Sequence, residues 1–120
     1  MSSPISILVV EDAFLVRMDI VDQLHERGFV VFEASNADDA VAFLADHPDI
    51  SVVFTDIDMP GSMDGLKLAR AVRDRWPPIK IIVTSGHRSV SENELPNDSR
   101  FFSKPYRAAE VAHAATEMTS

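Results

Sequence analysis

The chain has 120 residues, with 11 basic against 19 acidic residues and a net charge of -8. This is the length of one ordinary domain, and the absence of cysteine excludes disulfide scaffolds and zinc–thiolate sites. The acidic balance argues against direct binding to nucleic acids or anionic membranes. No apolar run approaches the roughly 20 residues of a membrane span, and no signal peptide is recognised. We therefore expect a cytoplasmic protein with a single domain over residues 1–120 and its core over residues 5–118.

Short apolar runs rich in β-branched residues alternate with helical patterns along the whole chain. The predicted strands are residues 5–10, 29–32, 51–55, 79–83 and 100–102. The predicted helices are residues 13–27, 36–47, 66–76 and 106–118. Residues 88–98 are poor in apolar side chains and contain Pro96, so any helix there is expected to be short.

Five strand–helix units in succession predict an α/β fold, a doubly wound five-stranded parallel sheet with helices on both faces. In the first helix, Phe14, Met18, Val21 and Leu24 recur at helical spacing and are expected to face the core. Ligand sites in open parallel sheets lie beyond the carboxyl ends of the strands. The residues that follow each predicted strand are therefore the candidates for function.

Polar side chains follow four of the five predicted strands. They are Glu11 and Asp12 after the first, Asp56 and Asp58 after the third, Thr84 after the fourth and Lys104 after the fifth. Taken alone, each has an ordinary explanation, because acidic residues complement helix dipoles and Asp is common in turns. Their joint placement at the strand ends of one topology is the informative feature.

This set of residues suits phosphoryl chemistry. Clustered carboxylates repel one another unless a cation or raised pKa values relieve them, and oxygen ligands favour Mg²⁺. The ammonium group of Lys104 can hold a phosphate oxygen. A central carboxylate such as Asp56 can act as a nucleophile and form an acyl phosphate.

With these motifs the sequence resembles the receiver domain of bacterial two-component response regulators. The resemblance extends from Ile5 to about Met118 and covers nearly the whole chain. It is based on residues 7–12 (ILVVED), 55–60 (TDIDMP), 63–65 (MDG), 82–86 (IVTSG) and 103–105 (SKP). The family implies a flavodoxin-like sheet with strand order 2-1-3-4-5.

The resemblance also implies a role for each acidic residue. Asp56 would be the phosphoacceptor, taking its phosphoryl group from a histidine kinase or a histidine phosphotransfer protein. Glu11, Asp12 and Asp56, together with the backbone carbonyl of Asp58, would hold Mg²⁺, with Mn²⁺ as an alternative. We also hypothesise that the Asp58 side chain tunes the access of Mg²⁺ or water, and hence dephosphorylation.

The remaining motif residues would carry the switch. Lys104 would pair with the phosphoryl group, and the Lys104–Pro105 peptide bond would be cis. Thr84 would donate its hydroxyl to a phosphoryl oxygen, and Phe101 matches the aromatic residue that then turns inward. The surface formed by the fifth strand and the helical segments before and after it, residues 88–98 and 106–118, would change for a partner to read.

The resemblance implies a signalling switch rather than a conventional enzyme, with Mg²⁺-dependent autophosphorylation from small donors and autodephosphorylation only. Its partners would be the kinase, which docks near Leu15, Val16 and Arg17, and an unknown downstream protein. A weak or phosphorylation-dependent homodimer is a further expectation. The chain is interpreted as a stand-alone regulator, and the alternative is a receiver excised from a larger regulator or hybrid kinase.

Two other functions remain open. Asp56-Ile57-Asp58 also fits the Asp-x-Asp motif of phosphatases with an aspartate nucleophile, in which the second Asp acts as acid and base. Against this, the chain leaves no room for a cap domain, and Pro60 stands where that motif has a small residue. A degenerate receiver used only for docking is disfavoured because every expected site residue is present.

Overall fold

The computed structural model describes residues 4–59, 61, 63–86, 90 and 92–120. Pro60, which bears on the phosphatase alternative, lies outside these residues. The strands are β1 Ser6–Val10, β2 Val30–Ala34, β3 Val52–Asp56, β4 Lys80–Ser85 and β5 Ser99–Ser103. They form one parallel sheet in the order β2-β1-β3-β4-β5, which confirms the predicted fold.

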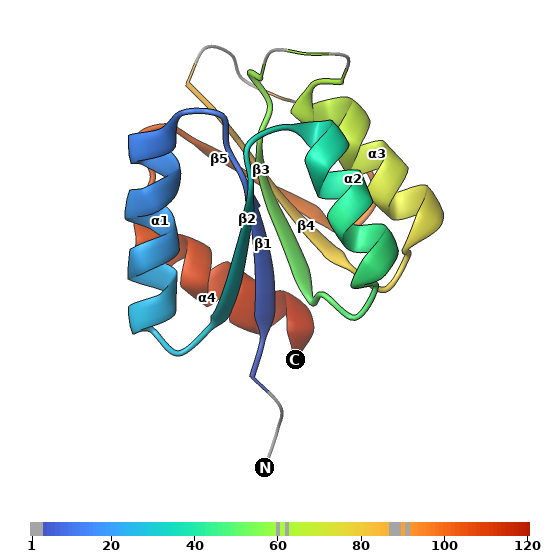
Figure 1. Cartoon of the computed structure of the whole chain (residues 1–120). Coiled ribbons are helices and arrows are strands. Elements are labelled where there is room, and N and C mark those ends of the chain that lie inside the picture. Colours follow the sequence, from blue (N-terminus) through green and yellow to red (C-terminus); the bar gives the residue numbers. More distant parts are fainter. Residues whose placement is uncertain (1–3, 60, 62, 87–89, 91) are drawn as a thin grey trace.

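Helices cover both faces of the sheet (Figure 1). They are α1 Phe14–Glu26, α2 Ala37–Asp46, α3 Gly65–Arg75 and α4 Ala108–Thr119. One apolar core lies between the sheet and the pair α2 and α3, and a second lies between the sheet and the pair α1 and α4. The central strands are buried on both faces, which explains why they are continuous apolar runs in the sequence.

Local sequence sets the ends of several helices. The Asn36 side chain accepts a hydrogen bond of 2.7 Å from the Asp39 N–H at the start of α2. Asp64 does the same for the Lys67 N–H at 2.9 Å at the start of α3. After α1, Gly28 adopts a φ of 94°, a conformation that L side chains rarely adopt.

The prediction that Phe14 and Met18, in the first two turns of α1, face the core is wrong. Phe14 is 61% exposed and Met18 is 43% exposed, whereas Ile20 and Leu24 are the buried residues. With 3.6 residues per turn, the line through Phe14 and Met18 lies to one side of the line through Ile20 and Leu24. Both pairs of residues are apolar, and α1 packs against the sheet with Ile20 and Leu24 facing inward.

The connection between β4 and β5 departs from a regular strand–helix unit. Within its described residues it contains only a 3₁₀ turn, η1 Glu92–Glu94, in agreement with the short helix expected there. Arg70 of α3 donates to the Glu94 carbonyl at 3.3 Å, and Arg73 donates to the Asn97 carbonyl at 2.7 Å. Two arginines of α3 therefore hold this segment through its backbone carbonyls.

Among the described residues, no helix combines the length and the apolar character needed to span a bilayer.

Candidate functional site

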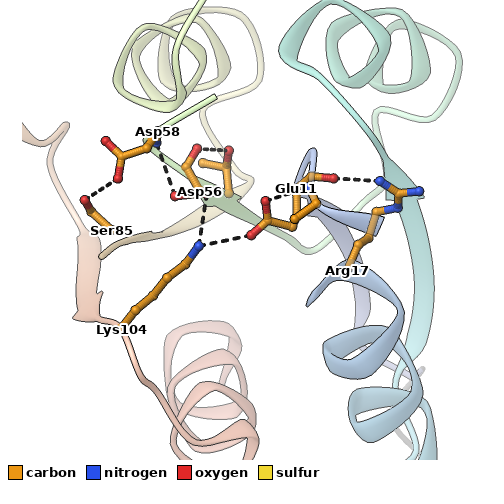
Figure 2. A network of polar contacts seen from close by, with 8 residues as sticks. Glu11, Arg17, Asp56, Asp58, Ser85 and Lys104 are labelled. Carbon is orange, nitrogen blue, oxygen red and sulfur yellow. Dashed lines mark hydrogen bonds and ion pairs between the residues drawn. The ribbon is translucent and has the colours of Figure 1, made fainter. Parts of the chain in front are cut away.

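The candidate site lies at the carboxyl-terminal edge of the sheet (Figure 2). Parallel register aligns Asp56, the last residue of β3, with Thr84 of β4. Glu11 directly follows β1, and its N–H donates to the Ala34 carbonyl of β2 at 3.1 Å. Lys104 directly follows β5, and its N–H donates to the Ser85 carbonyl at 2.9 Å. The topology therefore brings residues far apart in sequence to one edge.

Lys104 connects two of the acidic residues. Its Nζ donates to Glu11 Oε1 and to Asp56 Oδ2, in both cases at 3.1 Å. The peptide bond between Lys104 and Pro105 is cis, as predicted. Burial would lower the pKa of Lys104, but the hydrogen bonds to Asp56 and Glu11 raise it above its ordinary value. The ammonium group is therefore held in its charged form.

The acidic side chains form a compact cluster. Carboxylate oxygens of Glu11, Asp12 and Asp56 lie within 4.8 Å of one another, with Glu11 and Asp56 buried and Asp12 exposed. Burial raises the pKa of Glu11, the Ala13 N–H opposes this shift, and the charge of Asp56 adds to it. Crowded carboxylates with an open side provide the oxygen ligands that a hard divalent cation takes, so the donor set fits Mg²⁺.

Asp56 is held by its neighbours in the chain. The Asp58 N–H donates to Asp56 Oδ1 at 3.2 Å, and the Thr55 hydroxyl donates to the Asp56 carbonyl at 3.0 Å. The first residue of α3 is Gly65, whose N–H donates to the Ile57 carbonyl at 3.1 Å. The loop after β3 is therefore fastened at both ends.

Thr84 is buried, with 2% of its surface exposed, and its hydroxyl has no hydrogen-bond partner within the described part of the chain. Buried polar atoms are nearly always paired, so the unpaired Thr84 hydroxyl, on the residue aligned with Asp56, is a candidate functional group. Phe101, in contrast, lies outside the cluster. It aligns with Val83, is half-buried, and packs against the core beneath α2 and α3.

The sequence predicts no contact of Ser85 or Arg17 with the acidic residues, yet both bind them or their backbone. The Ser85 hydroxyl donates to Asp58 Oδ2 at 2.6 Å, so the Asp58 side chain is bound to β4. Arg17 of α1 donates to the Glu11 carbonyl at 2.7 Å and to Glu33 Oε1 at 2.8 Å. Ser85 follows Thr84 directly, and this adjacency was the only available signal for it. Nothing local in the sequence links Arg17 to Glu33.

Comparisons with known proteins agree with this geometry. A family model described as the response regulator receiver domain matches residues 7–116. The sensor kinase CckA of Brucella abortus is 34% identical over 122 residues, covering 98% of this chain and 13% of CckA. The receiver protein CpdR of the same species is 32% identical over 115 residues, covering 93% of this chain and 94% of CpdR. The crystal structure of a response regulator receiver protein from Sinorhizobium medicae has a TM-score of 0.89 at 27% identity, covering 98% of this chain and 95% of that chain.

The fold and the matches define a phosphoacceptor signalling domain of the two-component type. The chain belongs to the receiver domain family of response regulators. Receiver domains are non-enzymatic signalling domains that interact with histidine kinases and downstream targets. They bind Mg²⁺ in an acidic pocket, and in this chain the acidic cluster is formed by Glu11, Asp12 and Asp56.

Proposed function

We propose that Asp56 is the phosphoacceptor of a single receiver domain over residues 1–120, taking its phosphoryl group from a phosphohistidine of a kinase or phosphotransfer protein. One observation carries this assignment. The Lys104 ammonium group lies 3.1 Å from both Asp56 and Glu11, so one cation is held between two buried carboxylates at the open edge of the sheet. A positive charge in this position can stabilise a phosphoryl group on Asp56.

The transfer forms a bond between an Asp56 carboxylate oxygen and phosphorus while the nitrogen–phosphorus bond of the donor breaks. The bonding electron pair stays on the histidine nitrogen, which then takes up a proton. Lys104 Nζ pairs with a phosphoryl oxygen, and the unpaired Thr84 hydroxyl donates to another. The space that Thr84 leaves admits Phe101, which carries the change to the outer surface.

The carboxylates of Glu11, Asp12 and Asp56, with the backbone carbonyl of Asp58, would hold Mg²⁺, and Mn²⁺ could replace it. When bound, the cation neutralises charge on the phosphoryl oxygens. We also assign to the domain a Mg²⁺-dependent autophosphorylation from small donors and an autodephosphorylation. The Asp58 side chain, held by Ser85 at 2.6 Å, remains our candidate for tuning the lifetime of the phosphoryl group.

The partner surface is assigned to α1. Leu15 is 72% exposed and Val16 is 41% exposed, beside the exposed Phe14 and Met18. An apolar face next to the acidic cluster supports docking of the phosphodonor at α1. We place this interaction in the cytoplasm of a bacterium. The downstream partner is a protein, and a phosphorylation-dependent homodimer is a second way to pass on the signal.

The test is the intact mass of the protein after incubation with acetyl phosphate and Mg²⁺. We expect one added phosphoryl group, lost on omission of Mg²⁺ and in Asp56→Asn. Asp74→Asn is the matched control, because it removes an exposed carboxylate near the far end of α3 and should still be modified. An adduct that persists in Asp56→Asn would assign the acceptor elsewhere.

Two further measurements separate the alternatives. If the wild type shows no adduct, beryllofluoride binding distinguishes rapid hydrolysis from a domain that only docks. Repeated turnover of p-nitrophenyl phosphate, abolished in Asp58→Asn, would favour the phosphatase alternative. An unchanged phosphoryl lifetime in Asp58→Asn would remove the proposed tuning role of that side chain.

A further inference from the structure

Arg17 of α1 donates to the backbone carbonyl of Glu11 in the turn after β1 (Figure 2). It also donates to Glu33 of β2. Its Nη1 donates to the Glu11 backbone carbonyl at 2.7 Å, and its Nε donates to Glu33 Oε1 of β2 at 2.8 Å. The Arg17 side chain is only 13% exposed, whereas that of Glu33 is 51% exposed. A largely buried guanidinium thus spans the turn between β1 and α1.

Through this contact Arg17 restrains the backbone at Glu11, a member of the acidic cluster. Glu11 leaves β1 with its N–H on the Ala34 carbonyl, and its Oε2 accepts a hydrogen bond of 3.1 Å from the Ala13 N–H. Lys104 binds the other carboxylate oxygen of Glu11, and Arg17 adds a further restraint by holding its carbonyl. Because a guanidinium is planar and its donors have fixed directions, two acceptors bound to it are fixed relative to each other. The position of Glu11 and Asp12 is therefore tied to β2.

We propose that Arg17 is a positioning residue for the cation site, holding the turn at Glu11 and Asp12 in the geometry that binds Mg²⁺. This inference depends on the proposed function, because that function assigns the cation to the acidic cluster. Groups that orient metal ligands without touching the metal commonly change metal affinity tenfold or more. Arg17 makes no contact with the carboxylates themselves among the described hydrogen bonds, so it acts through the Glu11 backbone.

Charge alone predicts the opposite effect. A positive group near the cluster repels Mg²⁺, so removing it would strengthen binding if Arg17 acted only as a charge. If Arg17 positions the turn, its removal weakens binding. Lysine keeps the charge but lacks the fork that binds two acceptors, so Arg17→Lys separates the two explanations.

The experiment measures the Mg²⁺ dissociation constant by isothermal titration calorimetry at fixed ionic strength. For both Arg17→Gln and Arg17→Lys we expect Mg²⁺ binding to weaken about tenfold. The matched control is Arg100→Gln, which breaks the exposed pair between Arg100 and Glu117 at 2.7 Å on β5 and α4. We expect that control to change Mg²⁺ affinity by less than about twofold.

Urea unfolding without Mg²⁺ establishes that each variant is folded in the assay. If the Arg17 variants do not fold, Glu33→Gln tests the contacts of Arg17 from their exposed end, with an expected loss of about threefold. Unchanged affinity in these variants, or tighter binding in Arg17→Gln, would overturn the positioning role. Absence of Mg²⁺ binding by the wild type would overturn the proposed function together with this inference.

Discussion

Two threonines on adjacent strands differ in how their hydroxyl groups are bonded. Thr55 is fully buried, and its hydroxyl donates to the Asp56 carbonyl at 3.0 Å. Thr84 is also buried, but its hydroxyl has no partner among the described residues. An unpaired buried hydroxyl costs stability. Under the function proposed above, a phosphoryl oxygen on Asp56 would give this hydroxyl a partner.

Thr84→Val should therefore stabilise the unphosphorylated protein by about 1 kcal/mol, because it removes an unpaired buried hydroxyl at nearly constant volume. The measurement is urea unfolding in Mg²⁺-free buffer. The same change at Thr55 should destabilise the protein by about 1 kcal/mol, because it removes a hydrogen bond made in the native state. A loss of stability in Thr84→Val would mean that the hydroxyl is already bonded.

The start of α3 lies against the backbone at the end of β3. A Cβ at Gly65 would overlap the Asp56 carbonyl oxygen and lie 2.7 Å from the Ile57 Cα. Backbone cannot move aside as a flexible side chain can, so only glycine allows this close approach. The helix thereby supports the backbone at Asp56 and Ile57.

Gly65→Ala should destabilise the protein by about 3 kcal/mol, because α3 or the loop has to shift to admit the methyl group. Gly86→Ala is the control, since its Cβ would lie 3.4 Å from the flexible Lys104 Cδ. We expect that control to change the free energy of unfolding by less than about 0.5 kcal/mol. Equal effects in the two variants, measured by urea unfolding, would contradict the close approach as the cause.

In the complete molecule the sheet lies between two apolar cores, and the partly buried Tyr106 packs against the core beneath α1 and α4. Its ring meets the Phe54 ring edge-on, with the centroids 5.3 Å apart. Burial raises the pKa of Tyr106 to about 12, although the charge of Lys104 opposes the shift. The chain has one tyrosine, so its titration can be followed without interference from another phenol.

Absorbance titration of the tyrosinate band should give a midpoint near 12 in the folded protein and near the ordinary 10.0 in urea. Because the folded state holds the phenol proton more tightly, stability falls as the pH rises between these values. The loss should reach about 2 kcal/mol at the upper end and should be absent in Tyr106→Phe. A midpoint near the ordinary value in the folded state would mean that the phenol is solvated.

Much of this molecule could be predicted from the sequence alone. Continuous apolar runs predict strands buried on both faces, and their alternation with helical patterns predicts a parallel sheet. Ligand sites lie beyond the carboxyl ends of such strands, and this rule predicts Glu11, Asp56, Thr84 and Lys104 as candidates. The geometry brings all four to one edge.

Other features depend on the tertiary structure. The first helix has two apolar lines, and only packing against the sheet selects Ile20 and Leu24 over Phe14 and Met18. The chain has 19 acidic residues, and no local pattern selects Glu33 as the partner of Arg17 or Asp58 as the partner of Ser85. Hydrophobic periodicity and the ends of strands depend on neighbouring residues, so they can be predicted from the sequence. Helix rotation and long-range pairing arise only when separate elements meet, so the tertiary structure decided them.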